Sequence, residues 1–227
     1  MKTLQILLLI VFNCFIANCQ VMYNSLKMDS ISLKNDHYHL LYSAYNHEIL
    51  KPKSIIFLGN SLTESGNWNS LLKNKNVLNR GISGDITAGI LYRLNEITRH
   101  QPSKLFIEIG INDIANNIPL EQTINNYIKI IGQVKKESPG TKIYIQSLLP
   151  VNTKKTGLNK DYNTEIIEIN KELSKLTLKY QVGYVNIYPV MLNEEKELKK
   201  EYTTDGVHLT KKGYKAWVTY LKKQNYL

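Results

Sequence analysis

Three residues of this sequence carry the side chains that an enzyme needs to break an ester by acyl transfer. Ser61 follows the apolar run "SIIFLG" and Asn60, while Asp205 and His208 lie in "DGVHLT" near the carboxyl end. A serine hydroxyl becomes a nucleophile when an imidazole takes its proton and a carboxylate holds that imidazole in the right tautomer. In a short turn, the spacing of Asp205 and His208 lets both side chains face one direction, so the three residues form a candidate catalytic triad.

Acyl transfer also needs N–H donors around the oxygen that becomes negative in the transition state. The candidate donors are the backbone N–H groups of Ser61 and Gly84 and the side-chain amide of Asn112, in the segments "GNS", "NRGISGD" and "GIND". Asp85, which follows Gly84, is expected to brace this loop. Every role in an acyl-transfer site is therefore filled once.

Short apolar runs alternate with amphipathic helical patterns along the chain. The predicted strands are 54–59, 76–79, 104–110, 142–148 and 183–187, and the predicted helices are 36–49, 67–75, 87–98, 120–137, 162–180 and 210–224. Strands that are apolar at most positions and alternate with helices are typical of a parallel sheet covered on both faces. We therefore predict the α/β class: a three-layer α/β/α sandwich with a five-stranded parallel sheet and a flavodoxin-like topology.

In such sheets, ligands bind where the loops that follow the strands meet. Ser61 follows the first predicted strand, Gly84 the second and Asn112 the third. The segment that carries Asp205 and His208 precedes the last predicted helix. The candidate residues thus stand where the fold is expected to place a site.

The blocks "GNSLT", "NRGISGDIT", "GIND" and "DGVHLT" resemble, in order and approximate spacing, the four signature blocks of the SGNH hydrolases, also called GDSL-type esterases. The resemblance extends over residues 59–210. It implies the SGNH hydrolase fold, with Ser61 as nucleophile and Asp205 and His208 completing the triad. It also implies that Gly84 and Asn112 join the Ser61 N–H in the oxyanion hole, and that no cofactor is needed.

One position departs from the family pattern, because Asn60 stands where the family name has Asp. The change removes a negative charge beside the nucleophile but keeps hydrogen-bonding capacity. Within the family, "FLGNSLTESGNW" and "DGVHLTKKGYKAW" are most similar to the branch of platelet-activating-factor acetylhydrolase subunits and bacterial sialate or carbohydrate O-acetylesterases. That resemblance implies a small acyl group as substrate.

Taken one at a time, the candidate site residues also have structural explanations. Ser61 could cap a helix, Asp205 and His208 could form an ordinary turn, and Gly84 could serve a backbone with positive φ. Their joint placement at strand ends, in family order, favours catalysis instead. A binding module with a dead site would lack one member of the triad, and none is missing.

Trp68 and Arg80 are two further candidates, as substrate-binding residues beside the nucleophile. A Trp in the first helix after the nucleophile usually packs in the core. Arg80, likewise, could have a structural role instead of touching substrate. Glu108 and Asp113 are expected to serve strand packing and a loop hydrogen bond. His37 and His39 in "HYH" have no acidic or Cys companion at ligand spacing, so we predict no metal site there.

The amino end is predicted to be a secretory signal peptide, residues 1–19, followed by one hydrolase domain, residues 20–227. Lys2 precedes an apolar run without acidic residues, and the small Ala17 precedes Cys19 and Gln20. Cleavage before Gln20 is favoured over lipid attachment at Cys19, because a lipobox prefers Gly, Ala or Ser where Asn18 stands. The protein is therefore expected to be exported, to the periplasm or beyond, with no disulfide and no integral membrane span.

The chain is basic, with 29 Lys and Arg against 19 Asp and Glu and a formal net charge of +10. The basic residues are scattered singly or in pairs, and no basic run has interleaved aromatic residues. A solvated surface is thus favoured over a nucleic-acid site, although attraction to anionic glycans or anionic lipid is allowed. The oligomeric state is left open by the sequence.

These observations predict a secreted serine esterase that removes a short acyl group, acetyl first of all, from an O-acylated carbohydrate such as sialic acid or a plant glycan. The partner is then a small-molecule or glycan ester. The alternative is a lysophospholipase or acyl thioesterase of the same fold. The acetyl prediction depends on the lack of a long apolar lid that could hold a fatty chain.

Overall fold

Five parallel strands form one sheet, in the order β2-β1-β3-β4-β5. They are β1 (Ile55–Gly59), β2 (Val77–Gly81), β3 (Lys104–Glu108), β4 (Lys142–Gln146) and β5 (Gly183–Val185). The structure is a computed structural model that describes residues 35–48, 53–157, 160 and 162–227. The predicted parallel sheet is confirmed, whereas the predicted signal peptide lies outside the described residues.

Alternate side chains of the strands supply two separate cores, one on each face of the sheet. Ile56 and Leu58 of β1 belong to one hydrophobic cluster, and Phe57 between them belongs to the other. On the second face, the rings of Phe57, Phe106 and Tyr144 stack across neighbouring strands, with centroids 4.8 and 4.7 Å apart. These rings are paired in the strand register, so their stacking supports the alignment of β1, β3 and β4.

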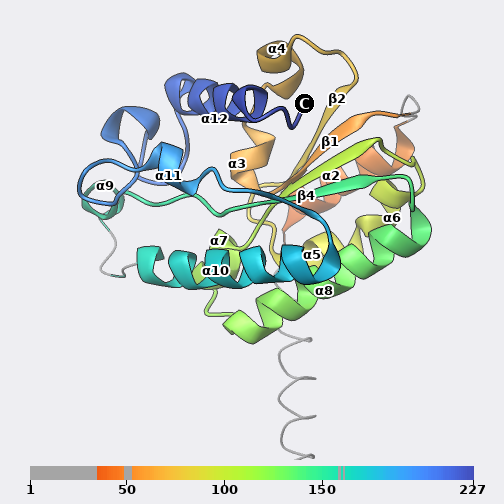
Figure 1. Cartoon of the computed structure of the whole chain (residues 1–227), viewed down its shortest axis with the longest axis horizontal. Helices are drawn as coiled ribbons and strands as arrows, with labels where there is room; N and C mark the ends of the chain where they lie inside the picture. Colours follow the sequence, from red (N-terminus) through yellow and green to blue (C-terminus); the bar gives the residue numbers. More distant parts are fainter. Residues whose placement is uncertain (1–34, 49–52, 158–159, 161) are drawn as a thin grey trace, which may run out of the picture.

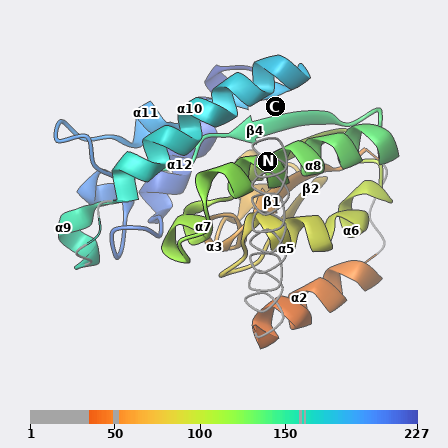
Figure 2. The same ribbon diagram turned by 90° about the horizontal axis from the view of Figure 1, so that it is seen from below.

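Helices cover both faces of the sheet (Figure 1). The first face is covered by α5 (Thr87–Tyr92), α6 (Leu94–Thr98), α8 (Leu120–Glu137) and α10 (Tyr162–Tyr180), and the second by α4 (Trp68–Leu72) and α12 (Lys211–Lys223). Helices α8 and α10 lie side by side, as Figure 2 shows from below. The three-layer sandwich is thus confirmed, and no helix among the described residues is long and apolar enough to cross a membrane.

Short helices join the main elements at the sheet edge where the strands end. They are α3 (Ser61–Glu64), α7 (Ile111–Ala115), α9 (Thr153–Thr156), α11 (Tyr188–Met191) and the 3₁₀ turn η1 (Lys200–Tyr202). None of them was predicted. The helix predicted over 87–98 is in fact two helices, because the chain breaks at Arg93 between α5 and α6.

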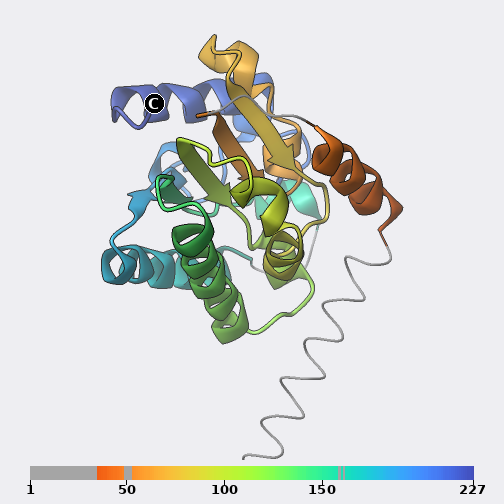
Figure 3. The same cartoon turned by 90° about the vertical axis from the view of Figure 1, so that its right-hand side faces the viewer.

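Helix α2 (Asp36–His47) lies on the outside of the molecule near the β2 edge, as Figure 3 shows. Two of its tyrosines attach it there. The Tyr38 hydroxyl donates to the Gly89 carbonyl oxygen at 2.7 Å, and the Tyr45 hydroxyl donates to the Gly81 carbonyl oxygen at 3.1 Å. The helix therefore covers the segment that runs from β2 to α5.

Candidate active site

Strand β1 ends in a tight turn that places Ser61 at the first position of α3. Gly59 has no room for a side chain, because a Cβ there would lie 2.2 Å from the Glu108 carbonyl oxygen. Asn60 caps the helix, and its Oδ1 accepts from the Leu62 N–H at 2.9 Å. Since Asp can cap a helix in the same way, the Asn at this position preserves the turn. The alternative that Ser61 is the cap is wrong.

The structure brings Ser61, Asp205 and His208 together although they are far apart in the sequence. His208 Nε2 lies 3.0 Å from Ser61 Oγ, and His208 Nδ1 lies 2.6 Å from Asp205 Oδ2. With the proton on Nδ1, the ring donates to the carboxylate and leaves Nε2 as the acceptor for the serine hydroxyl. This is the hydrogen-bond relay that activation of a serine requires.

The loop between η1 and α12 holds Asp205 and His208 in place. Asp205 Oδ1 accepts the backbone N–H groups of Val207 and His208, at 2.9 and 2.8 Å. The Thr203 hydroxyl donates to the His208 carbonyl oxygen at 2.9 Å and accepts from the Gly206 N–H at 2.8 Å. Both oxygens of the carboxylate are therefore engaged, one by the backbone and one by the imidazole.

These bonds set the charge of the Asp205 carboxylate. Partial burial acts to raise its pKa, but the hydrogen bonds from His208 and the backbone outweigh burial and lower the pKa to about 2. Asp205 is accordingly ionised at any pH at which an imidazole is neutral. The pair is at the surface, with the side chains 45% and 54% exposed for His208 and Asp205, so a substrate can reach it directly.

The segment 82–86 between β2 and α5, named here the Gly84 loop, lies next to helix α7. Gly84 is exposed and has a φ of +81°, which favours glycine. Asn112 of α7 donates from Nδ2 to the Asp85 carbonyl oxygen at 2.9 Å. An amide nitrogen carries two hydrogens, so this bond fixes the Asn112 side chain and leaves it a second donor.

Arg93 ties the Gly84 loop to the turn before Ser61. Its guanidinium is fully buried, and Nε donates to Asp85 Oδ2 at 3.0 Å. Nη2 donates to the Arg80 carbonyl oxygen at 2.8 Å and to the Gly59 carbonyl oxygen at 3.2 Å. Asp85 Oδ1 also accepts from the Ile86 N–H, so the bracing role predicted for Asp85 is confirmed.

Sequence reasoning missed Arg93, because one Arg inside an amphipathic pattern usually points to solvent. The charge of its partner, the Asp85 carboxylate, depends on the Arg93 guanidinium. Burial raises the pKa of Asp85 to about 6, and the Arg93 guanidinium opposes this rise. Without the cation, the carboxylate would be more easily protonated.

Asp113, next to Asn112, holds α7 against the start of α5. Its carboxylate accepts the Thr87 N–H at 3.1 Å and the Thr87 hydroxyl, and the Asn126 amide donates to that hydroxyl at 2.9 Å. Burial raises the pKa of Asp113 to about 7, against the lowering effect of the Thr87 bonds. The loop hydrogen bond predicted for Asp113 is thus confirmed.

Glu108 lies at the end of β3, beside Gly59 in the strand register. Its side chain is fully buried, and neither carboxylate oxygen has a hydrogen-bond partner in the structure. Burial raises the pKa of Glu108 to about 8. The group is therefore largely protonated at neutral pH, which is how an unpaired carboxyl tolerates a buried position.

The structure places Trp68 in the core, which was the structural alternative for this residue, and so corrects its candidacy as a substrate-binding residue. Trp68 is 1% exposed, and its ring stacks on Phe57 at a centroid distance of 4.2 Å. Its Nε1 donates to the Thr63 carbonyl oxygen at 2.8 Å, and Trp217 contacts its edge. Trp68 is a core residue that fixes the position of α3.

Arg80 is likewise structural, which corrects its predicted contact with substrate. Its side chain is 3% exposed, and it forms ion pairs with Glu96 at 2.8 Å and Glu48 at 2.7 Å. The guanidinium also lies over the Tyr45 ring, 4.5 Å from the centroid. Arg80 thereby joins β2 to α6 and α2, and its guanidinium is held by these partners.

The two histidines of "HYH" lie in α2, as predicted. His37 Nε2 is 2.9 Å from Glu64 Oε1, and Glu64 Oε2 accepts the Ser83 N–H. Among the described residues, no group of three or more His, Cys, Asp or Glu lies close enough together to hold a metal. Glu64, which sequence reasoning did not single out, links α3 to the Gly84 loop.

A Ser-His-Asp relay at the carboxyl edge of the parallel sheet of an α/β/α sandwich is the arrangement of a serine hydrolase. The chain belongs to the GDSL-like Lipase/Acylhydrolase family, whose model matches residues 57–216. It is accordingly a carboxylic ester hydrolase of the GDSL type. The matched segment contains Ser61, Gly84, Asn112, Asp205 and His208.

Comparison with known proteins supports this membership. The chain is 24% identical over 175 residues to platelet-activating factor acetylhydrolase IB subunit alpha1 of Rattus norvegicus, covering 72% of this chain and 71% of that one. A solved structure from Streptococcus pneumonia, described as that of a platelet activating factor, is 30% identical with a TM-score of 0.74, covering 93% and 98% of the two chains. A GDSL-like lipase of Bacteroides thetaiotaomicron is 26% identical with a TM-score of 0.71, covering 82% and 97%.

Proposed function

We propose that this ester hydrolase removes a short acyl group, acetyl first of all, from an O-acylated carbohydrate, through an acyl-enzyme on Ser61. The observation that carries the proposal is the continuous relay from Asp205 Oδ2 through His208 to Ser61 Oγ, with distances of 2.6 and 3.0 Å. Nucleophile, base and orienting carboxylate are already within hydrogen-bond reach of one another.

In the first half of the reaction, His208 Nε2 takes the proton of Ser61 Oγ while that oxygen attacks the acyl carbon. The carbonyl electron pair moves to the oxygen, which becomes negative in a tetrahedral intermediate. Donors from Ser61 N–H, Gly84 N–H and the second Asn112 Nδ2 hydrogen stabilise it. The intermediate collapses, the C–O bond to the alcohol breaks, and His208 gives its proton to the departing sugar oxygen.

In the second half, water repeats these steps with the acyl-enzyme. His208 takes a proton from the water as the water oxygen attacks the acyl carbon, and a second tetrahedral intermediate forms. Its collapse breaks the bond to Ser61 Oγ, which recovers a proton from His208 and releases the carboxylic acid. Asp205 remains ionised throughout and stabilises the imidazolium that forms in each half.

Two observations support a short acyl group. The curated relatives from rat and mouse are named acetylhydrolases. In the part of the chain that the structure describes, the large hydrophobic side chains that are most exposed are Leu40, Tyr92, Ile167 and Leu178, on α2, α5 and α10. None belongs to α3, α7 or the 203–210 loop, where a fatty acyl chain would need an apolar wall.

The test is a series of p-nitrophenyl esters from acetate to palmitate, run beside acetylated xylan and O-acetylated sialic acid. We expect acetate to be hydrolysed fastest among the p-nitrophenyl esters. We also expect the kcat/KM for acetate release from an acetylated glycan to exceed the kcat/KM for p-nitrophenyl acetate. A longer chain would gain roughly 0.8 kcal/mol for each CH₂ that it buries, so rates that climb steadily beyond butyrate would indicate a lipid hydrolase or thioesterase instead.

We also propose that the protein is exported, on the strength of the leader-like residues 1–19. Mass spectrometry of the protein from the culture medium or the periplasm should find an amino terminus at Gln20. An amino-terminal Cys19 carrying acyl chains would show a lipoprotein, and an intact Met1 would contradict export through this leader.

A further inference from the structure

A hollow lined by lysine and tyrosine lies along helix α12, apart from Ser61, Asp205 and His208. It has a volume of about 540 Å³ and is bounded by α12, α11 and η1. Its lining consists of Val190, Tyr202, Lys212, Lys215, Ala216, Thr219, Tyr220, Lys223 and Gln224. The volume falls within the roughly 300–1,000 Å³ typical of small-molecule sites.

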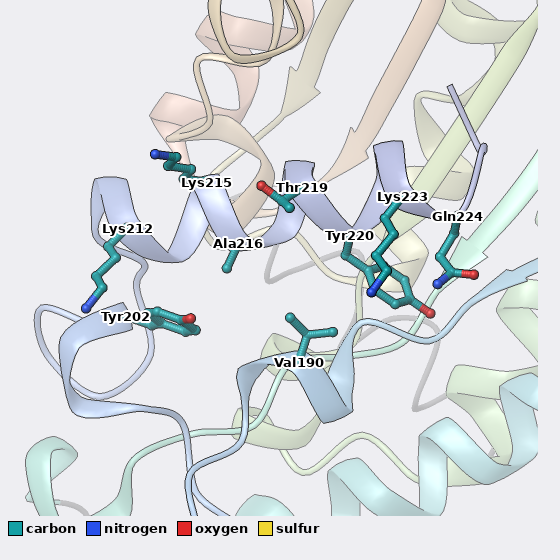
Figure 4. Close-up of a pocket in the computed structure, with 9 residues that line it drawn as sticks. All are labelled: Val190, Tyr202, Lys212, Lys215, Ala216, Thr219, Tyr220, Lys223 and Gln224. Atoms are coloured by element: carbon teal, nitrogen blue, oxygen red, sulfur yellow. The ribbon is translucent and has the colours of Figure 1, made fainter.

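The sequence of α12 explains the shape of this hollow. One stripe of the helix buries Tyr214, Trp217 and Leu221 against the sheet. On the stripe that faces α11, Ala216 is small and lies between larger residues at both ends. Figure 4 shows Lys212 and Tyr202 at one end, Lys223 and Gln224 at the other, and Val190 across from Ala216.

The lining is positively charged and contains no acidic residue. Lys212 has only a long ion pair with Glu201, 3.7 Å apart, and within the described part of the chain no ion pair engages Lys215 or Lys223. Lys212 also stands in the first turn of α12, which has no acidic residue, where the helix dipole disfavours a cation. The helix dipole therefore does not favour a lysine at that position.

The rings of Tyr202 and Tyr220 give the hollow two aromatic surfaces. The Lys199 ammonium lies over the Tyr202 ring at 5.1 Å and adds a further cation next to the lining. Aromatic rings pack against the C–H faces of pyranose sugars, while ammonium groups and the Thr219 and Gln224 side chains can bind carboxylates and hydroxyls. A lipid bilayer would instead require a flat or convex surface with protruding apolar side chains.

The hollow is continuous with the segment that carries the proposed triad. Tyr202 precedes Asp205, and Lys212 follows His208. The two sides are joined by a hydrogen bond of 2.9 Å from the Thr210 N–H to the Tyr202 carbonyl oxygen. The end of the hollow formed by Tyr202 and Lys212 therefore lies beside the loop that presents His208.

We propose that this hollow binds an acidic glycan, with the sugar rings on Tyr202 and Tyr220 and the carboxylates near Lys212 and Lys223. The inference rests on the proposed function, since it gives the O-acylated carbohydrate a negative charge. The bound sugars act as an anchor that raises the local concentration of acyl esters of the same polymer near Ser61.

The test measures binding of oligogalacturonate, which carries a carboxylate on each ring, and of a neutral xylo-oligosaccharide, by calorimetry on the full chain. Lys212→Glu/Lys223→Glu should raise the Kd for oligogalacturonate about tenfold, because two attractions become repulsions. Lys136→Glu/Lys171→Glu on α8 and α10 alters the net charge equally and should leave the Kd within about twofold. Both double variants should hydrolyse p-nitrophenyl acetate at the wild-type rate.

Equal weakening by both double variants would overturn the proposal, because it would show attraction to net charge alone. Equal affinity for the neutral oligosaccharide would overturn it too. Binding to phosphatidylserine vesicles that depends on Lys212 and Lys223, without binding to oligogalacturonate, would assign the hollow to a lipid surface instead. The binding measurement uses unacetylated sugars, so it tests the hollow independently of ester hydrolysis. Failure of the proposed function would appear instead as the absence of acetate release from acetylated glycans.

Discussion

Arg93 and Asp85 form an ion pair in which both side chains are fully buried, with Nε 3.0 Å from Oδ2. The same guanidinium reaches the Gly59 carbonyl oxygen, two residues before Ser61. One side chain therefore fixes the Gly84 loop relative to the nucleophile. Since catalysis by an oxyanion hole depends on this relative position, Arg93 is a positioning residue for the proposed reaction.

Arg93→Lys should lower kcat for p-nitrophenyl acetate about 10- to 100-fold with little change in KM. A lysine keeps the charge beside Asp85 but lacks the planar fork that binds the Gly59 and Arg80 carbonyl oxygens as well. Steady-state kinetics measures the effect, and circular dichroism confirms folding. Arg99→Lys on the surface is the control, and an unchanged kcat in folded Arg93→Lys would contradict the positioning role.

Ser61→Ala and His208→Ala should each reduce the hydrolysis rate by several orders of magnitude without unfolding the protein. The two residues act as a unit, so the double variant should be no slower than either single variant. A sulfonyl fluoride should label wild-type Ser61 and leave Ser61→Ala unlabelled in mass spectrometry. Losses that multiply in the double variant would mean that the two side chains do not share one proton-transfer step.

Asn112→Ala should lower kcat about 10²–10³-fold while KM stays nearly constant, because its second N–H is proposed to meet charge that develops only in the transition state. Asn69→Ala, an exposed position on α4, is the control for losing an amide. The decisive measurement is the separation of kcat from KM. A raised KM at constant kcat would make Asn112 a substrate-binding residue.

The sequence predicted the sheet and the long helices because their patterns repeat over many residues. The helices at 120–137 and 162–180 have the predicted limits, since each buries several apolar side chains at spacings of three and four. The helices α3 and α7 are only four and five residues long, and so short a segment has no periodicity to detect. Their positions follow from the strand ends rather than from any helical pattern.

The side-chain partners of buried charges were the part that the sequence did not reveal. Arg80 pairs with Glu96 of α6 and Glu48 beyond α2, and both contacts depend on how these helices pack against β2. Trp68 was ambiguous for a similar reason, because its burial depends on Phe57 and Trp217 from distant segments. The triad was easier to predict, since the family resemblance links its three residues without any knowledge of packing.

The last prediction concerns Glu108, whose unpaired carboxyl makes stability depend on pH. Its pKa is about 8 in the folded protein against an ordinary value of 4.5, so between these values the folded state holds a proton that the unfolded chain has released. The contribution of Glu108 to the free energy of unfolding therefore falls as the pH rises from 4.5 to 8. Glu108→Gln cannot ionise and keeps the shape of the side chain, so it should escape this loss.

Urea unfolding at pH 5 and pH 8 compares the two proteins. From pH 5 to pH 8, wild type should lose on the order of 2–4 kcal/mol relative to Glu108→Gln, at about 1.4 kcal/mol for each pKa unit. Glu168→Gln, on the exposed side of α10, should follow wild type at both pH values. If wild type and Glu108→Gln changed in parallel, Glu108 would be ionised in the folded state at neutral pH, and a cation or water would have to accompany its carboxylate.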